Sequence, residues 1–254
     1  MQGIGIVLFT LGGKNLKRAM RGLTEFLDNT VIVNDGKKES IDESKVKKYI
    51  KPAFVKYPSA CYNLGIRELL KDESIEHIFI VHDTIEVIDD TLFQDYIDVA
   101  NKTNLKTLYF CSPSDDPRGT FDNERLKINI GKDKEITLNM GTSGDLVYIH
   151  KDVFKKVGFF DERFRAAVEW SDFCYRVSQK NLSTPFLWFP HLDWARSKMI
   201  VSDNAEMYSD SVEDRIIRGL KLFHMKYKCQ ISELIDTYSK KDVINKLKNK
   251  TRSS

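Results

Sequence analysis

Short apolar segments alternate with segments of helical periodicity through the first 111 residues. The apolar runs, rich in β-branched side chains, predict strands over residues 4–9, 30–33, 54–56, 77–81 and 107–111. The segments between them predict helices over residues 15–26 and 58–70, and a helix that Asp89 and Asp90 cap and that reaches about Lys102. Strands that alternate with helices favour a mostly parallel sheet with helices on both faces. The first part of the chain therefore predicts an α/β fold.

The pattern loosens after residue 111. Residues 112–139 are polar and contain two weak strand patterns, over 126–130 and 136–138, which predict a small antiparallel portion. Two further strands are expected, over residues 146–150 and 184–189. Helices are expected over residues 151–157, 169–179, 211–228 and 231–248. The whole chain is predicted to form one α/β domain, with a twisted, mostly parallel sheet and a helical C-terminus.

Composition limits the partners and the compartment. The 254 residues, 41% of them apolar, are enough for one large domain. Forty basic residues stand against 37 acidic ones, and a net charge of +3 is too small to indicate nucleic acid as a partner. No apolar run approaches the roughly 20 residues that cross a bilayer. The four widely spaced cysteines form no C-x-x-C pair and the N-terminus has no secretory cleavage pattern, so we expect a cytoplasmic protein.

The tail over residues 240–254 is rich in lysine. Near an anionic membrane surface each such charge is worth about 1 kcal/mol. The tail therefore allows a weak peripheral contact with a membrane, and a frayed polar terminus is the alternative. The sequence gives no indication of an oligomeric state.

Polar side chains stand where the predicted parallel strands end. Thr10 closes the first strand, Asn34 and Asp35 follow the second, and Asp83 follows the strongest one. In open α/β sheets, ligands bind at the carboxyl ends of the strands. We therefore expect these side chains to line a binding site.

Two more carboxylates, those of Glu169 and Asp172, lie one turn apart at the start of a predicted helix. Negative charges at that place either belong to a site or complement the helix dipole. The residues alone leave both interpretations open.

Three segments of the first half resemble motifs of one known family. Residues 31–36, VIVNDG, resemble a V-D-D-G-S nucleotide-binding turn. Residues 60–66, ACYNLGI, resemble an A-R-N-x-G-I helix, and residues 78–92 resemble the strand that carries a D-x-D element.

Two segments of the second half extend this similarity. Residues 144–149 with 157–164 resemble the stretch G-x-x-x-x-I…V-G-x-F-D-E-x-F, and residues 169–176, EWSDFCYR, match E-D-x-D-x-C-Y-R at every fixed position but one. From Ile4 to about Tyr227 the chain thus resembles glycosyltransferase family 2, a branch of the GT-A superfamily.

The resemblance implies an inverting glycosyltransferase with a GT-A, Rossmann-like fold. It implies a GT-A domain over residues 1–228, with a nucleotide-binding half at about 1–111 and an acceptor and catalytic half at about 112–228, and a C-terminal helix and basic tail over 229–254. The implied donor is a nucleotide-sugar, a UDP-sugar by analogy with most relatives. The implied acceptor is a hydroxyl group of a glycan or a lipid-linked molecule, in polysaccharide or glycan synthesis.

The resemblance also assigns roles to the residues at the strand ends. Asp83 matches the second acid of D-x-D and is expected to hold a divalent cation, Mn²⁺ or Mg²⁺, with His191 as an additional ligand. A histidine bonded to the backbone is the alternative for His191. Thr10, with Asn34 or Asp35, is expected to contact the nucleotide, although Asn34 equally fits a residue that only ends a strand.

The sequence departs from the family pattern at two important positions. Val81 stands in place of the first acid of D-x-D, and Trp170 stands in place of the aspartate that is the base in many relatives. Glu169 then becomes the leading candidate for the catalytic base and Asp172 the second. These departures keep a degenerate nucleotide- or sugar-binding protein open as an alternative. A nucleotidyltransferase is less favoured, because only Gly12, Gly13 and Lys14 suggest a phosphate loop.

Overall fold

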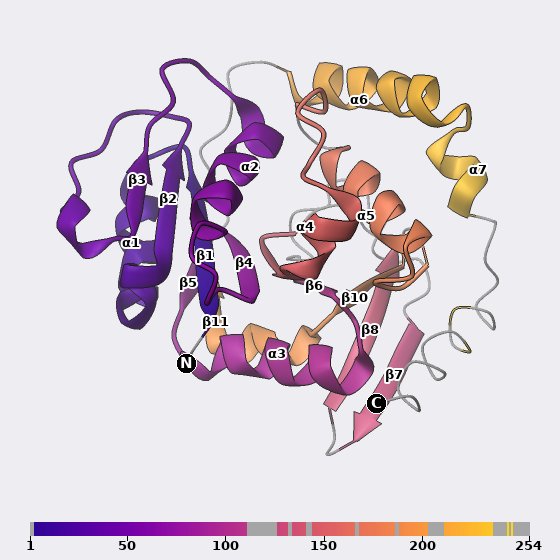
Figure 1. Ribbon diagram of the computed structural model, residues 1–254, viewed down its shortest axis with the longest axis horizontal. Coiled ribbons are helices and arrows are strands. Elements are labelled where there is room, and N and C mark those ends of the chain that lie inside the picture. Colours follow the sequence, from indigo (N-terminus) through magenta and orange to yellow (C-terminus); the bar gives the residue numbers. More distant parts are fainter. Residues whose placement is uncertain are drawn as a thin grey trace.

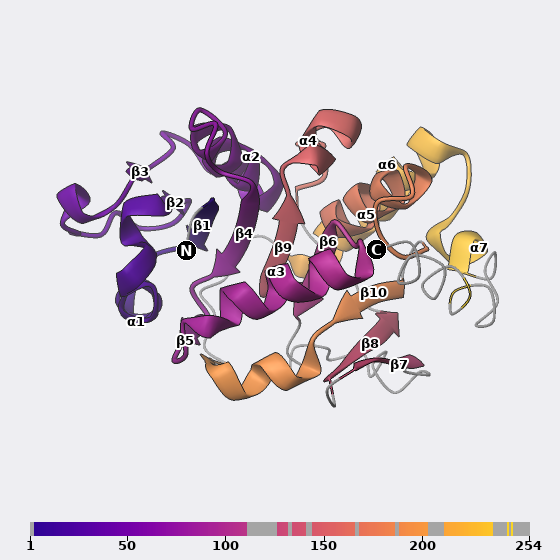
Figure 2. The same cartoon turned by 60° about the horizontal axis from the view of Figure 1, so that its bottom comes forward.

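A nine-stranded sheet runs through the molecule, and helices pack on both of its faces (Figure 1). Figure 2 shows the two helical layers from a second direction. The computed structural model describes residues 3–110, 126–131, 134–140, 144–165, 168–185, 188–202, 211–235, 243 and 245. The mixed α/β architecture confirms the predicted fold class.

The strands of the large sheet follow the order β3-β2-β1-β4-β9-β6-β10-β8-β7. Their bounds are β1 Ile4–Thr10, β2 Thr30–Asn34, β3 Lys48–Ile50, β4 His77–His82, β6 Thr107–Phe110, β7 Leu126–Gly131, β8 Lys134–Met140, β9 Leu146–His150 and β10 Trp188–His191. Strands β1 to β4 are mutually parallel, whereas β9 and β8 are antiparallel to both of their neighbours. The sheet is therefore mostly parallel, as predicted.

A second, two-stranded antiparallel sheet pairs β5 (Ile85–Val87) with β11 (Met199–Val201). The α-helices of the described residues are α1 Lys14–Gly22, α2 Tyr57–Leu69, α3 Thr91–Thr103, α4 Asp152–Val157, α5 Glu169–Gln179, α6 Val212–Tyr227 and α7 Ile231–Ile235. The same ranges contain the 3₁₀ helices η1 Thr24–Asn29, η2 Glu43–Lys45 and η5 Asp193–Lys198. Within the described ranges, no helix is long and apolar enough to cross a membrane.

Alternating side chains of the strands build two separate cores. Ile6 and Leu8 of β1 pack in the core that contains residues of α1 and α3, whereas Val7 and Phe9 pack in the core that contains residues of α2 and α5. This period of two is the geometry of a strand buried on both faces. It explains why the apolar run of β1 is continuous.

Several elements differ from the sequence prediction. Residues 54–56 form no strand, and Phe54 is 80% exposed; the third parallel strand is β3 instead. The first helix ends at Gly22 rather than at residue 26, because a 3₁₀ helix follows it. A Cβ at Gly22 would lie 2.5 Å from the backbone nitrogen of Val87, so only glycine lets α1 approach β5 this closely.

The other differences concern short or late elements. Strand β10 begins at Trp188 rather than at residue 184 and contains Pro190 and His191. Strands β5 and β11 were not predicted from the sequence. The last helix is described only to Ile235, and most of the predicted range up to 248 lies outside the described residues, as does residue 111.

Candidate functional site

Thr10, Asn34 and Asp83 lie along the carboxyl edge of the large sheet. Thr10 ends β1, Asn34 ends β2, and Asp83 directly follows β4, and these three strands run in parallel. Parallel strands end on the same edge of a sheet. The structure therefore brings these three residues to one edge, as expected.

Asp83 is held by the end of the first strand. The Thr10 hydroxyl donates to Oδ2 of Asp83 at 2.5 Å and accepts from the Gly12 amide at 2.8 Å. The Asp83 amide donates to the Phe9 carbonyl at 3.1 Å. Asp83 is 6% exposed, so its carboxylate points along a fixed direction at the sheet edge. The structure thus places Thr10 as a support for Asp83.

Asn34 fixes the turn that follows β2. Its amide nitrogen donates to the Lys37 carbonyl at 2.7 Å and to the Tyr49 hydroxyl at 2.9 Å, and its amide oxygen accepts from the Gly36 amide at 2.9 Å. A Cβ at Gly36 would lie 1.7 Å from the Leu11 carbonyl oxygen, so the turn packs directly against the loop after β1.

Asp35 joins this turn to a helix. Its carboxylate accepts from the Lys56 amide at 2.8 Å and from the Tyr57 amide at 2.8 Å. These amides belong to the start of α2, where backbone donors have no intrahelical acceptor. Asp35 therefore stabilises the first turn of α2, and it is only 3% exposed.

Asp83 is the predicted anionic ligand for a cation at this edge, and Asp145, which is 9% exposed, lies at the same edge because it precedes β9, a strand antiparallel to β4. The described residues contain no group of three or more His, Cys, Asp or Glu side chains that could hold a metal ion. In the sheet order, β9 and β6 lie between β4 and β10, so His191 lies on a strand about 14 Å from β4. The Asp83 carboxylate fits a cation that takes further ligands from a diphosphate.

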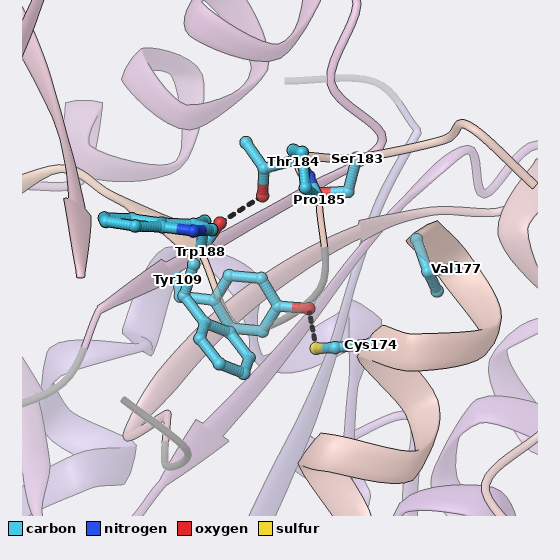
Figure 3. A pocket seen from close by; sticks show the side chains of 8 residues that line it. Tyr109, Cys174, Val177, Ser183, Thr184, Pro185 and Trp188 are labelled. Carbon is cyan, nitrogen blue, oxygen red and sulfur yellow. Dashed lines mark hydrogen bonds between the residues drawn. The ribbon is translucent and has the colours of Figure 1, made fainter. Parts of the chain in front are cut away.

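His191 is 1% exposed, and its ring centroid lies 6.3 Å from that of Tyr109. Trp188 of the same strand and Tyr109 line a small cavity of about 10 Å³, room for about one water molecule. Figure 3 shows its lining, in which Tyr109 and Cys174 share a 2.8 Å hydrogen bond and Thr184 donates to the Trp188 carbonyl. This cavity is too small for a sugar.

Glu169 begins α5 and is 6% exposed. Among the described residues, its Oε2 atom has no hydrogen-bond partner. Burial raises the pKa of Glu169 to about 7, against the opposing effect of backbone amides and the positive charge of Arg215 on α6. A carboxyl group of this kind can take up a proton near neutral pH.

Asp172, one turn further along α5, has very different surroundings. Its Oδ1 accepts from the Lys226 ammonium and the Tyr227 hydroxyl, both at 2.6 Å, and its Oδ2 accepts from Nε of Arg176 at 3.0 Å. Lys226 also binds Asp161 at 2.8 Å. Asp172 therefore joins α5 to α6 in a buried ionic cluster.

Two residues near Glu169 were not predicted as site residues, Tyr62 and His82. The Tyr62 hydroxyl and Nε2 of His82 share a hydrogen bond of 2.7 Å, and the rings of Tyr62 and Trp170 lie 5.4 Å apart. Burial first, and then the negative charge of Glu169, raise the pKa of Tyr62 well above its ordinary value. Burial lowers the pKa of His82 to about 4, so its ring is neutral.

The sequence did carry a signal for both residues. His82 is the middle residue of V-H-D, and Tyr62 stands where the A-R-N-x-G-I motif has arginine. His82 ends β4 at the carboxyl edge of the sheet, and Tyr62 lies on α2, within hydrogen-bond distance of it.

No family model and no curated protein sequence matches the chain. Several solved structures are similar to it. GalNAc-T7 with UDP, GalNAc and Mn²⁺ has a TM-score of 0.58 at 12% identity, over 90% of this chain and 49% of that protein. Mannosyltransferase PcManGT from Pyrobaculum calidifontis, in complex with GDP-Man and Mn²⁺, has a TM-score of 0.53 at 9% identity, over 98% of this chain and 69% of that protein.

S. aureus TarS has a TM-score of 0.51 at 12% identity, over 88% of this chain. The chain spans only 39% of TarS and 49% of GalNAc-T7. At such low identities these similarities concern the fold. Together with the strand order, they show that the chain has a GT-A-like fold.

Proposed function

We propose that this chain is an inverting glycosyltransferase that moves a sugar from a UDP-sugar to a hydroxyl acceptor. The observation that carries the proposal is Glu169, a buried carboxylate at the start of α5 with one oxygen that no described residue binds. Burying such an oxygen without a partner costs stability, which is the pattern of a catalytic group rather than a structural one. Its pKa of about 7 suits a general base at neutral pH.

The proposed reaction is a single displacement. Glu169 accepts the proton of the acceptor hydroxyl as the hydroxyl oxygen forms a bond to the anomeric carbon. The bond between that carbon and the diphosphate oxygen breaks on the opposite face, and the nucleoside diphosphate leaves with the bonding electrons. Attack from the face opposite the leaving group inverts the configuration at the anomeric carbon.

Asp83 is the residue that we propose for the diphosphate side of the site. A divalent cation bound there, Mn²⁺ or Mg²⁺, would neutralise the charge that builds on the leaving oxygens. Thr10 fixes the orientation of the Asp83 carboxylate by its hydrogen bond. We keep His191 as a candidate second ligand, which predicts that His191→Ala raises the Mn²⁺ concentration needed for half-maximal donor binding.

We assign the nucleotide to the edge formed by β1 and β2. Asn34 and Asp35 hold the turn after β2 and the start of α2 in place, and so shape the surface on which a nucleotide would lie. Asp35→Ala should therefore weaken binding of free nucleoside diphosphate and of nucleotide-sugar by similar factors. Normal binding of the free nucleoside diphosphate by this variant would refute the assignment.

A product assay tests the function. The purified chain is incubated with UDP-sugars and with GDP-mannose, because both nucleotides occur in complexes of similar fold. Mn²⁺ or Mg²⁺ is added, together with glycan and lipid-linked acceptors. Release of nucleoside diphosphate with formation of a glycoside supports the proposal. Asp83→Ala should abolish metal-dependent donor binding and leave the fold intact, since this residue lies beyond the end of β4.

Trp170 favours a second candidate function, a degenerate binding protein. This indole is 3% exposed and packs 5.0 Å from the ring of Phe160, so no carboxylate stands beside Glu169 at that position. Thermal stabilisation by a nucleotide-sugar without release of any product would support the binder. Release of pyrophosphate from a nucleoside triphosphate and a sugar phosphate would instead support a nucleotidyltransferase.

A further inference from the structure

Large apolar side chains are exposed at two places on the site side of the molecule. Phe54 is 80% exposed and Val55 is 55% exposed, in the loop between β3 and α2. On α6, Ile217, Leu220 and Met225 are 43%, 45% and 67% exposed. Exposed apolar groups that gather in this way mark interaction surfaces.

The loop of Phe54 lies at the carboxyl edge of the sheet. Strand β3 is parallel to β2, so the chain leaves it at the edge that carries the candidate site. Asp35 fixes the end of this loop through the amides of Lys56 and Tyr57. Figure 1 shows the connection from β3 to α2 at the top of the molecule.

Helix α6 also lies beside the candidate site, in the upper part of Figure 1. Its inner face carries Phe223, which is fully buried, and Lys226, which binds Asp172 of α5. Arg215 on the same face exerts its charge on Glu169. The opposite face, with Ile217 and Leu220 one turn apart, packs against no described element closely enough to be buried.

Basic side chains flank both apolar groups. Lys51 and Lys56 are exposed on either side of Phe54, and the exposed Arg165 places its guanidinium over the Tyr57 ring at 5.4 Å. On α6, Arg218 and Lys221 are exposed next to Ile217 and Leu220. The exposed acids of α6, Glu213 and Asp214, lie in its first turn only.

We propose that this face, the loop over residues 51–56 together with the outer face of α6, docks on an anionic lipid bilayer. Apolar side chains that enter the interface, with lysine and arginine beside them, are the combination that binds peripheral proteins to anionic membranes. The same excess of positive charge on both elements opposes contact with a second copy of the face, because like charges would meet. Charge complementarity therefore favours a negatively charged surface.

Docking in this manner directs the carboxyl edge of the sheet toward the lipid headgroups. If the proposed glycosyl transfer is correct, the acceptor hydroxyl would then be presented by a lipid-linked molecule in the same membrane. The docking itself does not depend on that activity, and it is measured without donor or acceptor.

Vesicle co-sedimentation of the full chain tests the proposal. Vesicles of phosphatidylglycerol and phosphatidylcholine in equal parts should bind the protein at low salt, and vesicles of phosphatidylcholine alone should not. Phe54→Ser with Val55→Ser, and Ile217→Ser with Leu220→Ser, should each weaken binding about tenfold, because the removed groups are apolar anchors. Lys221→Gln should weaken it about fivefold.

The matched control is Ile88→Ser with Ile200→Ser. Ile88 directly follows β5 and Ile200 lies on β11, in the small sheet that Figure 1 shows below β1; they are 57% and 48% exposed. Their loss should leave vesicle binding unchanged. A second variant, with Lys246, Lys248 and Lys250 replaced by glutamine, measures how much the lysine-rich tail contributes to vesicle binding. Circular dichroism of each variant confirms that it is folded.

Three results would overturn the proposal. One is that the wild-type chain does not bind anionic vesicles at low salt. Another is that the tail variant abolishes binding while both pairs of serine substitutions leave it unchanged, since the tail alone would then hold the membrane. The third is self-association of the chain that the serine pairs disperse, without vesicle binding, which would assign the face to a second copy.

Discussion

Two buried carboxylates one turn apart on α5 have opposite surroundings. Both oxygens of Asp172 bind donors, from an arginine, a lysine and a tyrosine. Glu169 is also buried, but its Oε2 has no partner among the described residues, and burial raises its pKa to about 7. The sequence motif contains both acids and does not distinguish their roles. Their hydrogen-bond partners in the structure distinguish a structural carboxylate, Asp172, from a candidate catalytic one, Glu169.

The comparison leads to a simple rule for this helix. The Asp172 carboxylate holds an arginine, a lysine and a tyrosine, so its loss leaves these donors without their partner. A desolvated carboxylate with an open oxygen gains from a proton. We therefore expect substitutions at the two positions to affect different properties, activity at Glu169 and stability at Asp172.

The largest expected effect is on turnover in Glu169→Gln. Glutamine keeps the shape and removes the basicity, so transfer to the acceptor should fall by 10²–10⁴-fold, the order of magnitude typical of a lost general base. Donor affinity, measured by calorimetry, should stay unchanged. Glu135→Gln, which alters only an exposed pair with Lys127, is the control. Retention of more than about a tenth of the activity would move the role to Asp172 or favour the degenerate binder.

Asp172→Asn should lower the free energy of unfolding by about 3 kcal/mol, because it leaves partly buried cations without their charge partner. Lys226 keeps its contact with Asp161, which limits the loss. Urea denaturation measures the change, and Glu135→Gln, at an exposed ion pair, should change stability by less than about 1 kcal/mol. Equal stability of the two variants would contradict the structural role of Asp172.

Glu169→Gln should also stabilise the fold, in a manner that depends on pH. The folded pKa of about 7 exceeds the ordinary value of 4.5, so the folded chain binds more protons than the unfolded chain between these values. Wild-type stability should therefore fall as the pH rises from about 4.5 to about 7, and the penalty should be complete above that range. At pH 8 we expect the variant to be more stable by about 1–3 kcal/mol.

Thermal unfolding at pH 4, 6 and 8 measures this difference. The gain should vanish at pH 4, where the carboxyl group is protonated in both states. A constant difference at all three pH values would mean that the charge of Glu169 is not the cause. The same set of samples reports the activity, which for the wild type should rise as the pH passes about 7 if the deprotonated base is required.

Thr10→Val should have the smallest effect. It removes the hydroxyl that binds Asp83 and accepts from the Gly12 amide, and the strand keeps a β-branched residue. A lost hydrogen bond to a charged group corresponds to about a tenfold loss of metal-dependent donor affinity. Thr107→Val is the matched control. Thr107 begins β6, so it lies at the opposite edge of the sheet from the candidate site, and its hydroxyl donates to Ser183. Equal donor affinity in the two variants would contradict the support of Asp83 by Thr10.

The parallel core of the fold could be predicted because its strands are continuous apolar runs. Strands β1, β2 and β4 are buried on both faces, and the sequence alone locates them. Strand β3 has the sequence KYI, with a charged residue and partial exposure, so no pattern reveals it. The Phe54 segment misled the prediction because β-branched and aromatic residues in an exposed loop resemble a buried strand.

Positions at strand ends could be predicted as well, since Asp83 and Thr10 follow from the rule for parallel sheets. The side chains that contact the site residues could not be predicted. The hydrogen bond between Tyr62 and His82, and the charge of Arg215 on Glu169, join residues that are far apart in the sequence. Such contacts depend on how α2, α5 and α6 pack, which the periodicity of each helix does not determine.

The contact between Asp35 and the start of α2 makes Cys61 a kinetic reporter of local opening. Cys61 lies one turn into α2 and is fully buried, and burial with the negative charge of Asp35 raises the pKa of its thiol, so the closed state does not react. The rate of Cys61 alkylation, measured by peptide mass spectrometry, then reports how often the start of α2 opens. The more accessible Cys229 supplies the fast reference. A bound nucleotide that holds the turn after β2 closed would slow the Cys61 reaction and leave that of Cys229 unchanged.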